Sequence, residues 1–169
     1  MSFHVRQLDA ADVSGFRSLR LEALRLHPAA YGSSFAEELR DPPEDLQRRF
    51  LRPPAATFGG FSGDALVGIA SLLMQTRCKT RHRADVFSVY VKAAHRHGGI
   101  GRALVEAAIS HARDNGICVL HLTVTDGNDG ARRMYEDLGF RQFALERRAL
   151  MVDSVFHDTV HMTMDLDVG

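Results

Sequence analysis

The sequence is poor in several features that would place it in a specialised class of protein. It has no tryptophan, and its two cysteines, Cys78 and Cys118, are too few for the disulfide framework of a small secreted protein. No apolar run approaches the roughly 20 residues of a membrane-spanning helix, and the N-terminus lacks the apolar core of a signal peptide. Basic and acidic residues balance at 21 each, so no net charge attracts nucleic acid or an anionic membrane. We therefore expect a cytoplasmic protein that has neither nucleic acid nor a membrane as a partner.

The composition that remains is that of an ordinary globular protein. Hydrophobic residues make up 45% of the chain and charged residues 25%. A chain of this length buries about two-thirds of its unfolded surface on folding. We find no internal repeat, low-complexity tract or linker, so we predict a single domain over residues 1–169.

Hydrophobic periodicity predicts an alternation of strands and helices. The predicted strands are residues 3–8, 57–61, 65–73, 84–91, 119–124, 141–152 and 156–166. The predicted helices are residues 10–26, a short helix from 41 to about 50, 100–115 and 129–138. Strands that are first antiparallel and later joined through helices indicate a mixed sheet in an α/β (α+β) fold.

The most informative segment is the turn between the predicted strand at 84–91 and the helix at 100–115. Its notable residues are Arg96, Gly98, Gly99 and Gly101. Glycines in such a turn let the backbone approach a ligand closely and point N–H groups at one spot, and the helix adds the positive end of its dipole. The turn therefore predicts an anion site suited to a pyrophosphate. The alternative is a glycine-rich connection without a ligand; the dinucleotide and nucleoside-triphosphate loop patterns are absent.

Two motifs in this half of the chain resemble the acyl-CoA signature of the GNAT superfamily of N-acetyltransferases. Residues 91–104 resemble the family's Gln/Arg-x-x-Gly-x-Gly/Ala loop, although Ala94 stands where many relatives have proline. Residues 128–140 resemble its Asn-x-x-Ala-x-x-x-Tyr motif followed by Leu-Gly-Phe. The core of the resemblance covers about residues 57–140. It implies a mostly antiparallel central sheet of six to seven strands, about four flanking helices and a splayed strand pair at the acyl-CoA site.

The resemblance also implies that acetyl-CoA is the cosubstrate. We expect no metal, because His157 and His161 have a spacing found in metal sites but fall in a predicted strand with no third ligand nearby. Backbone groups around Val89, Tyr90 and Val91, freed by a bulge in their strand, would bind the pantetheine arm and the acetyl carbonyl. The expected pyrophosphate contacts are Arg96, His97, Gly98, Gly99, Ile100, Gly101 and Arg102. The expected pantetheine contacts on the later helix are Asn128, Ala131 and Tyr135. For Asn128 the alternative is a plain helix N-cap, and both roles are compatible.

Tyr135 matches the tyrosine that in this family protonates the departing CoA thiolate. A phenol with a pKa of about 10 can donate to a thiolate whose conjugate acid has a pKa of about 8.5, because that transfer costs only about 2 kcal/mol. The alternative is that Tyr135 packs on its helix beside Ala131 and Leu138 with the hydroxyl at the rim.

Asp85 stands at the strand position where several family members carry a glutamate general base, eleven residues before Arg96. A carboxylate needs a raised pKa or a water relay to deprotonate an ammonium, and aspartate is shorter than glutamate. The alternative is a solvated aspartate paired with Arg83 or Lys92. Both interpretations stay open at this point.

The leading hypothesis is therefore an acetyl-CoA-dependent N-acetyltransferase that transfers an acetyl group to a primary amine of a small molecule by direct attack on the thioester. One alternative is acetylation of a protein lysine or N-terminus, which requires an open groove between the early helices and the last hairpin. Another is a non-catalytic acyl-CoA-binding regulatory module. Because members of this family often form dimers, the resemblance also leads us to expect a homodimer. The candidate acceptor-side residues are His27, Tyr31, Phe35, Glu37 and Glu38.

Overall fold

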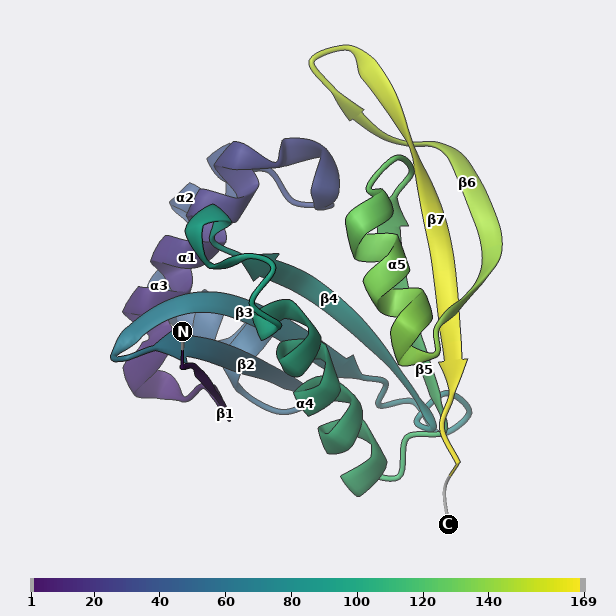
Figure 1. Cartoon of the computed structure of the whole chain (residues 1–169), viewed down its shortest axis with the longest axis horizontal. Coiled ribbons are helices and arrows are strands. Elements are labelled where there is room, and N and C mark those ends of the chain that lie inside the picture. Colours follow the sequence, from purple (N-terminus) through teal and green to yellow (C-terminus); the bar gives the residue numbers. More distant parts are fainter. Residues whose placement is uncertain (1, 168–169) are drawn as a thin grey trace.

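The computed structural model describes residues 2–167, and seven strands in it form one sheet in the order β1-β2-β3-β4-β5-β7-β6 (Figure 1). The strands are β1 (His4–Gln7), β2 (Ala55–Ser62), β3 (Ala65–Met74), β4 (Arg83–Val91), β5 (Val119–Thr125), β6 (Arg141–Val152) and β7 (Val155–Asp165). The helices are α1 (Val13–Leu26), α2 (Phe35–Arg40), α3 (Pro43–Leu46), α4 (Ile100–Asp114) and α5 (Asp129–Leu138). Short turns of helix are η1 (Ala10–Asp12), η2 (Pro28–Ala30), η3 (Gln47–Leu51) and η4 (Ala93–His95). All neighbouring strands are antiparallel except β4 and β5, which confirms the predicted mixed, mostly antiparallel sheet.

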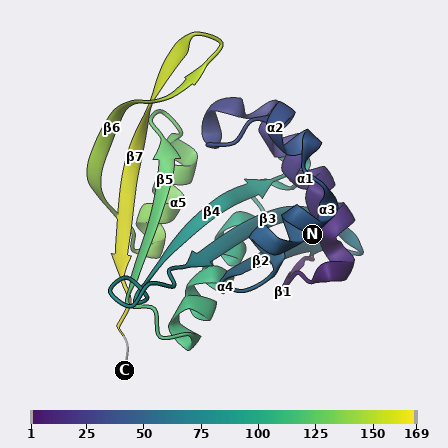
Figure 2. The same ribbon diagram turned by 180° about the vertical axis from the view of Figure 1, so that it is seen from behind.

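Helices cover the two faces of the sheet in separate groups. On one face α1 packs through Phe16 and Leu19 in a buried cluster that also contains Ile69 of β3. On the other face α4 packs through Leu104 and Ala108, which are fully buried. Figures 1 and 2 show these two groups from opposite sides, with α5 lying against β5 and β7 on the α4 side. Among residues 2–167 no α-helix covers the other face of the β5–β7–β6 end of the sheet (Figure 2), although the short turn η2 contacts β5 and β6.

The segment between α1 and β2 contains more helix than the sequence predicted. The expected short helix from 41 to about 50 is α3 followed by η3, and α2 precedes it as an additional helix. α2 begins with a capping box, in which the Ser34 hydroxyl accepts from the Glu37 amide and the Glu37 carboxylate accepts from the Ser34 amide. This Ser-x-x-Glu signal is present in the sequence and fixes the start of a helix of only six residues.

Several predicted ends are confirmed by their backbone conformation. Gly116 follows α4 with a positive φ of 73°, as a C′ glycine does. The last hairpin turns at Asp153 and Ser154, both in the left-handed region. The predicted first long helix begins later than expected, because Asp9 caps the 3₁₀ turn η1 and α1 starts at Val13.

Strands β4 and β5 form the feature that positions the candidate site. They pair in parallel only from Arg83 to Asp85, opposite Val119 to His121, and then diverge (Figure 1). On its other edge β5 pairs with β7 along its whole length, from Val119 to Thr125. The predicted splayed strand pair is thus confirmed.

Within residues 2–167 no helix has both the length and the apolar character needed to cross a bilayer.

Candidate functional site

The opening between β4 and β5 is bordered by an irregularity in β4. The register of β4 on β3 shifts so that Ile69 faces Tyr90 and Ser71 faces Phe87, which leaves two β4 residues opposite one residue of β3. The first of them, Ser88, has a positive φ of 56°. This is the predicted bulge in the strand; such a bulge leaves backbone groups outside the regular ladder.

The predicted anion turn lies directly beside this opening. Gly99 is the N-cap of α4 with a φ of 86°, and no side chain caps the helix. The first intrahelical bond of the turn joins the Ala103 amide to the Gly99 carbonyl at 3.0 Å, so the amides before it have no partner in the helix. A Cβ added at Gly99 would have no heavy atom within 4 Å. The turn therefore offers N–H donors that have no partner in the helix, at the positive end of a 15-residue helix, which suits a pyrophosphate.

The position of this turn is fixed by close packing at Gly101 and by Arg96. A Cβ added at Gly101 would lie 3.5 Å from the Met134 sulfur of α5 and 3.6 Å from Val91 of β4, so the first turn of α4 sits between these elements. The Arg96 Nε donates to the Val91 carbonyl at 2.9 Å, and its Nη2 lies 3.0 Å from the His27 Nε2. Arg96 thus ties the turn to the ends of β4 and α1, in addition to the charge expected from it. Burial, followed by the charge of Arg96, lowers the pKa of His27.

Tyr135 lies on α5, across the opening from β4. Its side chain is 6% exposed, and its ring packs edge-on to Phe140 with 6.0 Å between centroids. Burial, and to a smaller extent the neighbouring Tyr31, raise the pKa of Tyr135 well above its usual value. The phenol is therefore protonated at neutral pH. At the start of the same helix the Asn128 Oδ1 accepts from the Ala131 amide at 3.4 Å, which confirms the N-cap interpretation of Asn128.

Asp85 lies at the closed end of the strand pair, and its partners differ from the sequence expectation. Its carboxylate accepts from the Gln75 Nε2 at 2.7 Å, and in register it faces His121 of β5. The pairing with Arg83 or Lys92 that the alternative interpretation of Asp85 included is wrong: Arg83 lies 2.7 Å from the His121 Nδ1 instead. Lys92 is directed to Glu22, 3.6 Å away.

His121 is a polar neighbour of Asp85 that the sequence did not single out. Burial, and next the charge of Arg83, lower the pKa of His121, so its ring is neutral at pH 7. An Arg83 guanidinium always donates, which makes the His121 Nδ1 an acceptor and leaves the proton on Nε2. No local pattern could have identified His121, because its place beside Asp85 depends on the parallel register of two strands.

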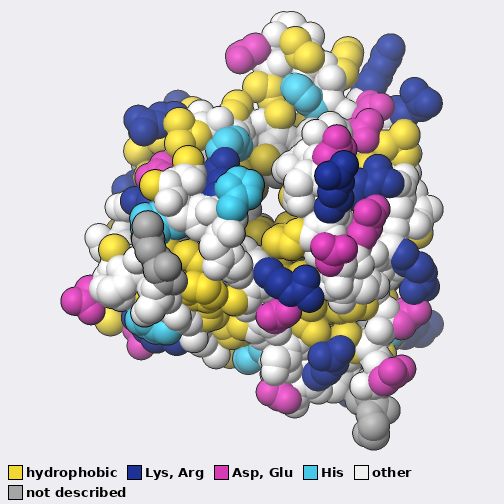
Figure 3. Space-filling model, in the orientation of Figure 1, with side chains coloured by type: hydrophobic (Ala, Val, Ile, Leu, Met, Phe, Trp, Pro, Cys, Tyr) yellow, Lys and Arg dark blue, Asp and Glu magenta, His cyan; other side chains and the backbone are white. Residues whose placement is uncertain are grey.

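A trough on the acceptor side runs between the α1–α2 segment and the last hairpin. It consists of two adjoining cavities of about 350 and 180 Å³ that share Tyr31, Gly32 and Leu150. Of the expected acceptor-side residues, Tyr31, Phe35 and Glu37 line it, whereas Glu38 is 2% exposed and bonded to Arg20. The space-filling view shows a deep hollow between the turn before α4 and helix α5, with histidine and basic side chains along one border (Figure 3).

With this geometry in place, comparison with known proteins decides the family. Residues 20–140 match the family model described as the Acetyltransferase (GNAT) family. The chain belongs to the GNAT acetyltransferase family. The solved structure of yncA, a putative acetyltransferase from Salmonella typhimurium with its cofactor acetyl-CoA, has a TM-score of 0.80 at 24% identity and covers 99% of this chain and 95% of that one.

Two curated GNAT relatives match over part of the chain. A mycothiol acetyltransferase from Thermobispora bispora is 33% identical over 108 residues, which is 61% of this chain and 37% of the relative. The N-alpha-acetyltransferase RimI from Mycobacterium tuberculosis is 32% identical over 107 residues, which is 63% of this chain and 65% of the relative. The matches thus span less than two-thirds of either relative.

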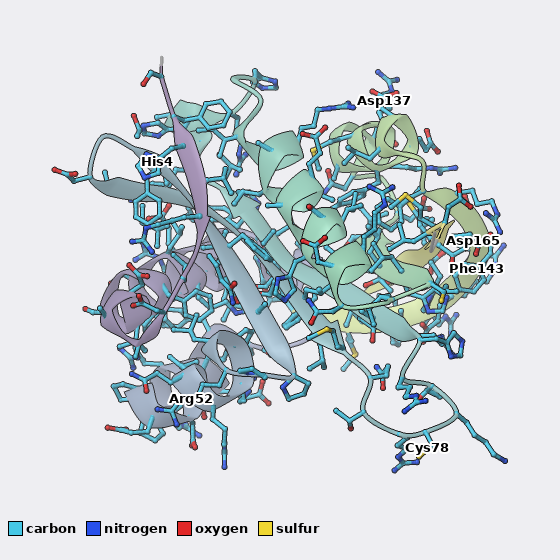
Figure 4. The ribbon with its side chains drawn as sticks, turned by 90° about the horizontal axis from the view of Figure 1, so that it is seen from below. His4, Arg52, Cys78, Asp137, Phe143 and Asp165 are labelled. Atoms are coloured by element: carbon cyan, nitrogen blue, oxygen red, sulfur yellow. The ribbon has the colours of Figure 1, made fainter. Side chains whose placement is uncertain are left out.

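Two other polar features of this GNAT chain are the His161–Glu146 pair and Cys78. The His161 Nε2 is 2.7 Å from the Glu146 carboxylate, and within residues 2–167 no group of three or more His, Cys, Asp or Glu side chains is arranged to hold a metal ion. Cys78 lies in the exposed loop between β3 and β4 (Figure 4).

Proposed function

We propose that this chain transfers an acetyl group from acetyl-CoA to a primary amine of a small molecule. The observation that carries the proposal is the opening between β4 and β5, which has the uncapped N-terminus of α4 on one side and the buried Tyr135 on the other. Family membership and the acetyl-CoA-containing neighbour support the identity of the donor.

In the proposed complex the turn before α4 binds the pyrophosphate of acetyl-CoA. The residues assigned to this contact are Arg96, His97, Gly98, Gly99, Ile100, Gly101 and Arg102. Arg102 also pairs with Glu106 at 2.9 Å on the exposed side of α4. The bulged backbone of Val89, Tyr90 and Val91 binds the pantetheine arm and the acetyl carbonyl, with Asn128, Ala131 and Tyr135 on the opposite wall.

Two side chains carry the proton transfers of a direct attack on the thioester. Asp85 removes a proton from the acceptor ammonium through a water relay, because its carboxylate lies at the closed end of the opening and is held by Gln75. Tyr135 donates its phenolic proton to the CoA sulfur as the C–S bond breaks. Its raised pKa keeps that proton in place throughout the neutral range.

A second acceptor class is favoured by the open trough between the α1–α2 segment and the last hairpin. The larger cavity is lined by apolar side chains such as Leu24, Phe35 and Met151, with Glu37 also present. Such a trough admits the N-terminal residues of a peptide, and the RimI relative is named an N-alpha-acetyltransferase. The candidate alternative is therefore acetylation of a protein N-terminus or lysine.

One experiment separates these functions. The chain is incubated with acetyl-CoA and a panel of small amines, amino acids and N-terminally free peptides, and the release of CoA thiol is measured. Turnover confined to small amines supports the leading proposal, and turnover confined to peptides supports the alternative. Binding of acetyl-CoA without turnover of any acceptor indicates a non-catalytic acyl-CoA-binding module. We also propose that the chain is a single domain over residues 1–169, that it acts in the cytoplasm and that it forms a homodimer.

A further inference from the structure

A buried ion pair that has no place in the proposed function connects α1 to α2. Arg20 and Glu38 are 4% and 2% exposed, and two hydrogen bonds join them, from Nε at 2.9 Å and from Nη2 at 2.8 Å. Burial alone would raise the pKa of Glu38, but the hydrogen bonds and charge of Arg20 outweigh it and lower that pKa. Removing two charges from water is unfavourable, so a buried pair is weak evidence of a purely stabilising role.

The third guanidinium nitrogen of Arg20 contacts the bulge in β4. Its Nη1 donates to the Ser88 hydroxyl at 2.9 Å, and Ser88 itself is only 6% exposed. Ser88 has a φ of 56°, a conformation that residues with a Cβ adopt rarely and glycine adopts freely. A serine persists in such a conformation only where its surroundings hold it there.

The next residue of the bulge is held from the same side. The Tyr31 hydroxyl donates to the Val89 carbonyl at 3.0 Å, and the Arg20 guanidinium carbon lies 5.1 Å from the centre of the Tyr31 ring. Two consecutive residues of the bulge, Ser88 and Val89, are therefore bonded to side chains of the α1–α2 segment. On β3 the register leaves them opposite a single residue, so the sheet alone does not fix their orientation.

We propose that Arg20, oriented by Glu38, is a positioning residue that fixes the Ser88 bulge so that the backbone of β4 can polarise the acetyl carbonyl. This inference rests on the proposed function, because it assigns the bulge to the carbonyl of acetyl-CoA. A donor that stabilises a developing oxyanion must be held in place before the reaction, and small displacements lower the rate. The ion pair thus holds β4 through Ser88, from the face of the sheet that α1 covers.

Two substitutions break the connection at different points while leaving the fold's main supports. Arg20→Lys keeps a positive charge beside Glu38 but removes the Nη1 donor to Ser88. Ser88→Gly keeps the ion pair and tolerates the positive φ but removes the hydroxyl. Arg141→Lys is the matched control, because Arg141 forms an exposed ion pair with Asp165 at 3.0 Å, with 64% and 65% of the two side chains exposed.

The primary readout is the infrared carbonyl stretch of acetyl-CoA labelled with ¹³C at the acetyl carbonyl and bound to each protein. In the wild type we expect a shift to lower frequency relative to free acetyl-CoA. In both variants the shift is expected to shrink, while the Kd for acetyl-CoA changes less than about threefold, since the pyrophosphate site is unchanged. With an acceptor from the panel, kcat should fall about tenfold with little change in KM. The double variant should be no worse than the poorer single variant.

The outcomes separate this inference from the proposed function. A wild-type shift that both variants and the control retain overturns the role of Arg20, as does the absence of any wild-type shift. Effects of Arg20→Lys and Ser88→Gly on kcat that multiply indicate independent structural damage and also overturn it. A wild type that binds acetyl-CoA but turns over no acceptor contradicts the proposed function, whereas the carbonyl shifts still decide the role of Arg20.

Discussion

Replacing Tyr135 with phenylalanine tests the proposed acid without disturbing the packing of α5. The ring stays in place against Phe140 and the side chain is 6% exposed, so only the hydroxyl is lost. Among residues 2–167 the Tyr135 hydroxyl has no hydrogen-bond partner, so its removal leaves no buried group unsatisfied there. We therefore expect the free energy of unfolding to change by less than about 1 kcal/mol.

The expected loss of rate follows from the chemistry of the leaving group. A positioned general acid contributes about 10²- to 10⁴-fold. A thiolate is a stable leaving group whose conjugate acid has a pKa of about 8.5, and the raised pKa of Tyr135 weakens its driving force for donation. Both considerations favour the lower end of the range. We predict that kcat falls about 10²-fold, equivalent to about 2.7 kcal/mol of lost transition-state stabilisation.

The assay measures CoA thiol release at saturating acetyl-CoA and acceptor, together with the Kd for acetyl-CoA by calorimetry. The Kd should change less than about threefold, because in the proposed mechanism the phenol acts on the leaving sulfur and the pyrophosphate binds at the turn before α4. Asp137→Asn is the control on the same helix, since Asp137 points away from the body of the protein (Figure 4). A kcat within about threefold of the wild-type value would remove Tyr135 as the acid. An equal loss in kcat and in acetyl-CoA affinity would reassign it to binding.

Three further predictions address the turn, the base and the acceptor side. Gly99→Asp should raise the Kd for acetyl-CoA at least about tenfold, because the new carboxylate would accept from the free N–H groups of the turn and repel the pyrophosphate, and because the φ of 86° is strained for a residue with a Cβ. An unchanged affinity by calorimetry would contradict the anion site. Asp85→Asn should lower kcat/KM at neutral pH at least about tenfold and flatten the acid limb of its pH profile, and an unaltered profile would eliminate Asp85 as the base. Tyr31 has its pKa raised to about 12 by burial, so the folded form resists ionisation. The stability that the neutral Tyr31 phenol contributes is complete below about pH 10, and about 2 kcal/mol of it is lost as the pH rises towards 12. In urea titrations the free energy of unfolding of Tyr31→Phe should therefore fall less between pH 10 and 12 than that of the wild type. An equal fall in the two proteins would refute this prediction.

The parts of the site that could be predicted from the sequence are those encoded over a few neighbouring residues. Glycines between an apolar strand and an amphipathic helix predict the turn at Gly98 to Gly101, and the position of Asn128 directly before α5 predicts an N-cap. Each of these signals acts through the local backbone, so no knowledge of the sheet is needed to interpret it. The same holds for the Ser34 capping box, which predicts α2 although the six residues that follow carry too little periodicity to suggest a helix.

The polar groups that meet across the fold carry no such local signal. Arg20 is 18 residues from Glu38 and 68 from Ser88, and it lies in a helix whose other arginines are half-buried (Arg17) or exposed (Arg25). Glu37 and Glu38 are adjacent, identical in type and both in the first turn of α2. The rotation of α2 about its axis places Glu37 at the surface, where it accepts from the Ser34 amide, and places Glu38 in the interior, where it bonds to Arg20 of α1. Because that rotation is decided by packing between α1, α2 and the bulge of β4, the sequence shows two adjacent glutamates but does not predict that Glu38 is buried against Arg20, which bonds to the bulge of β4.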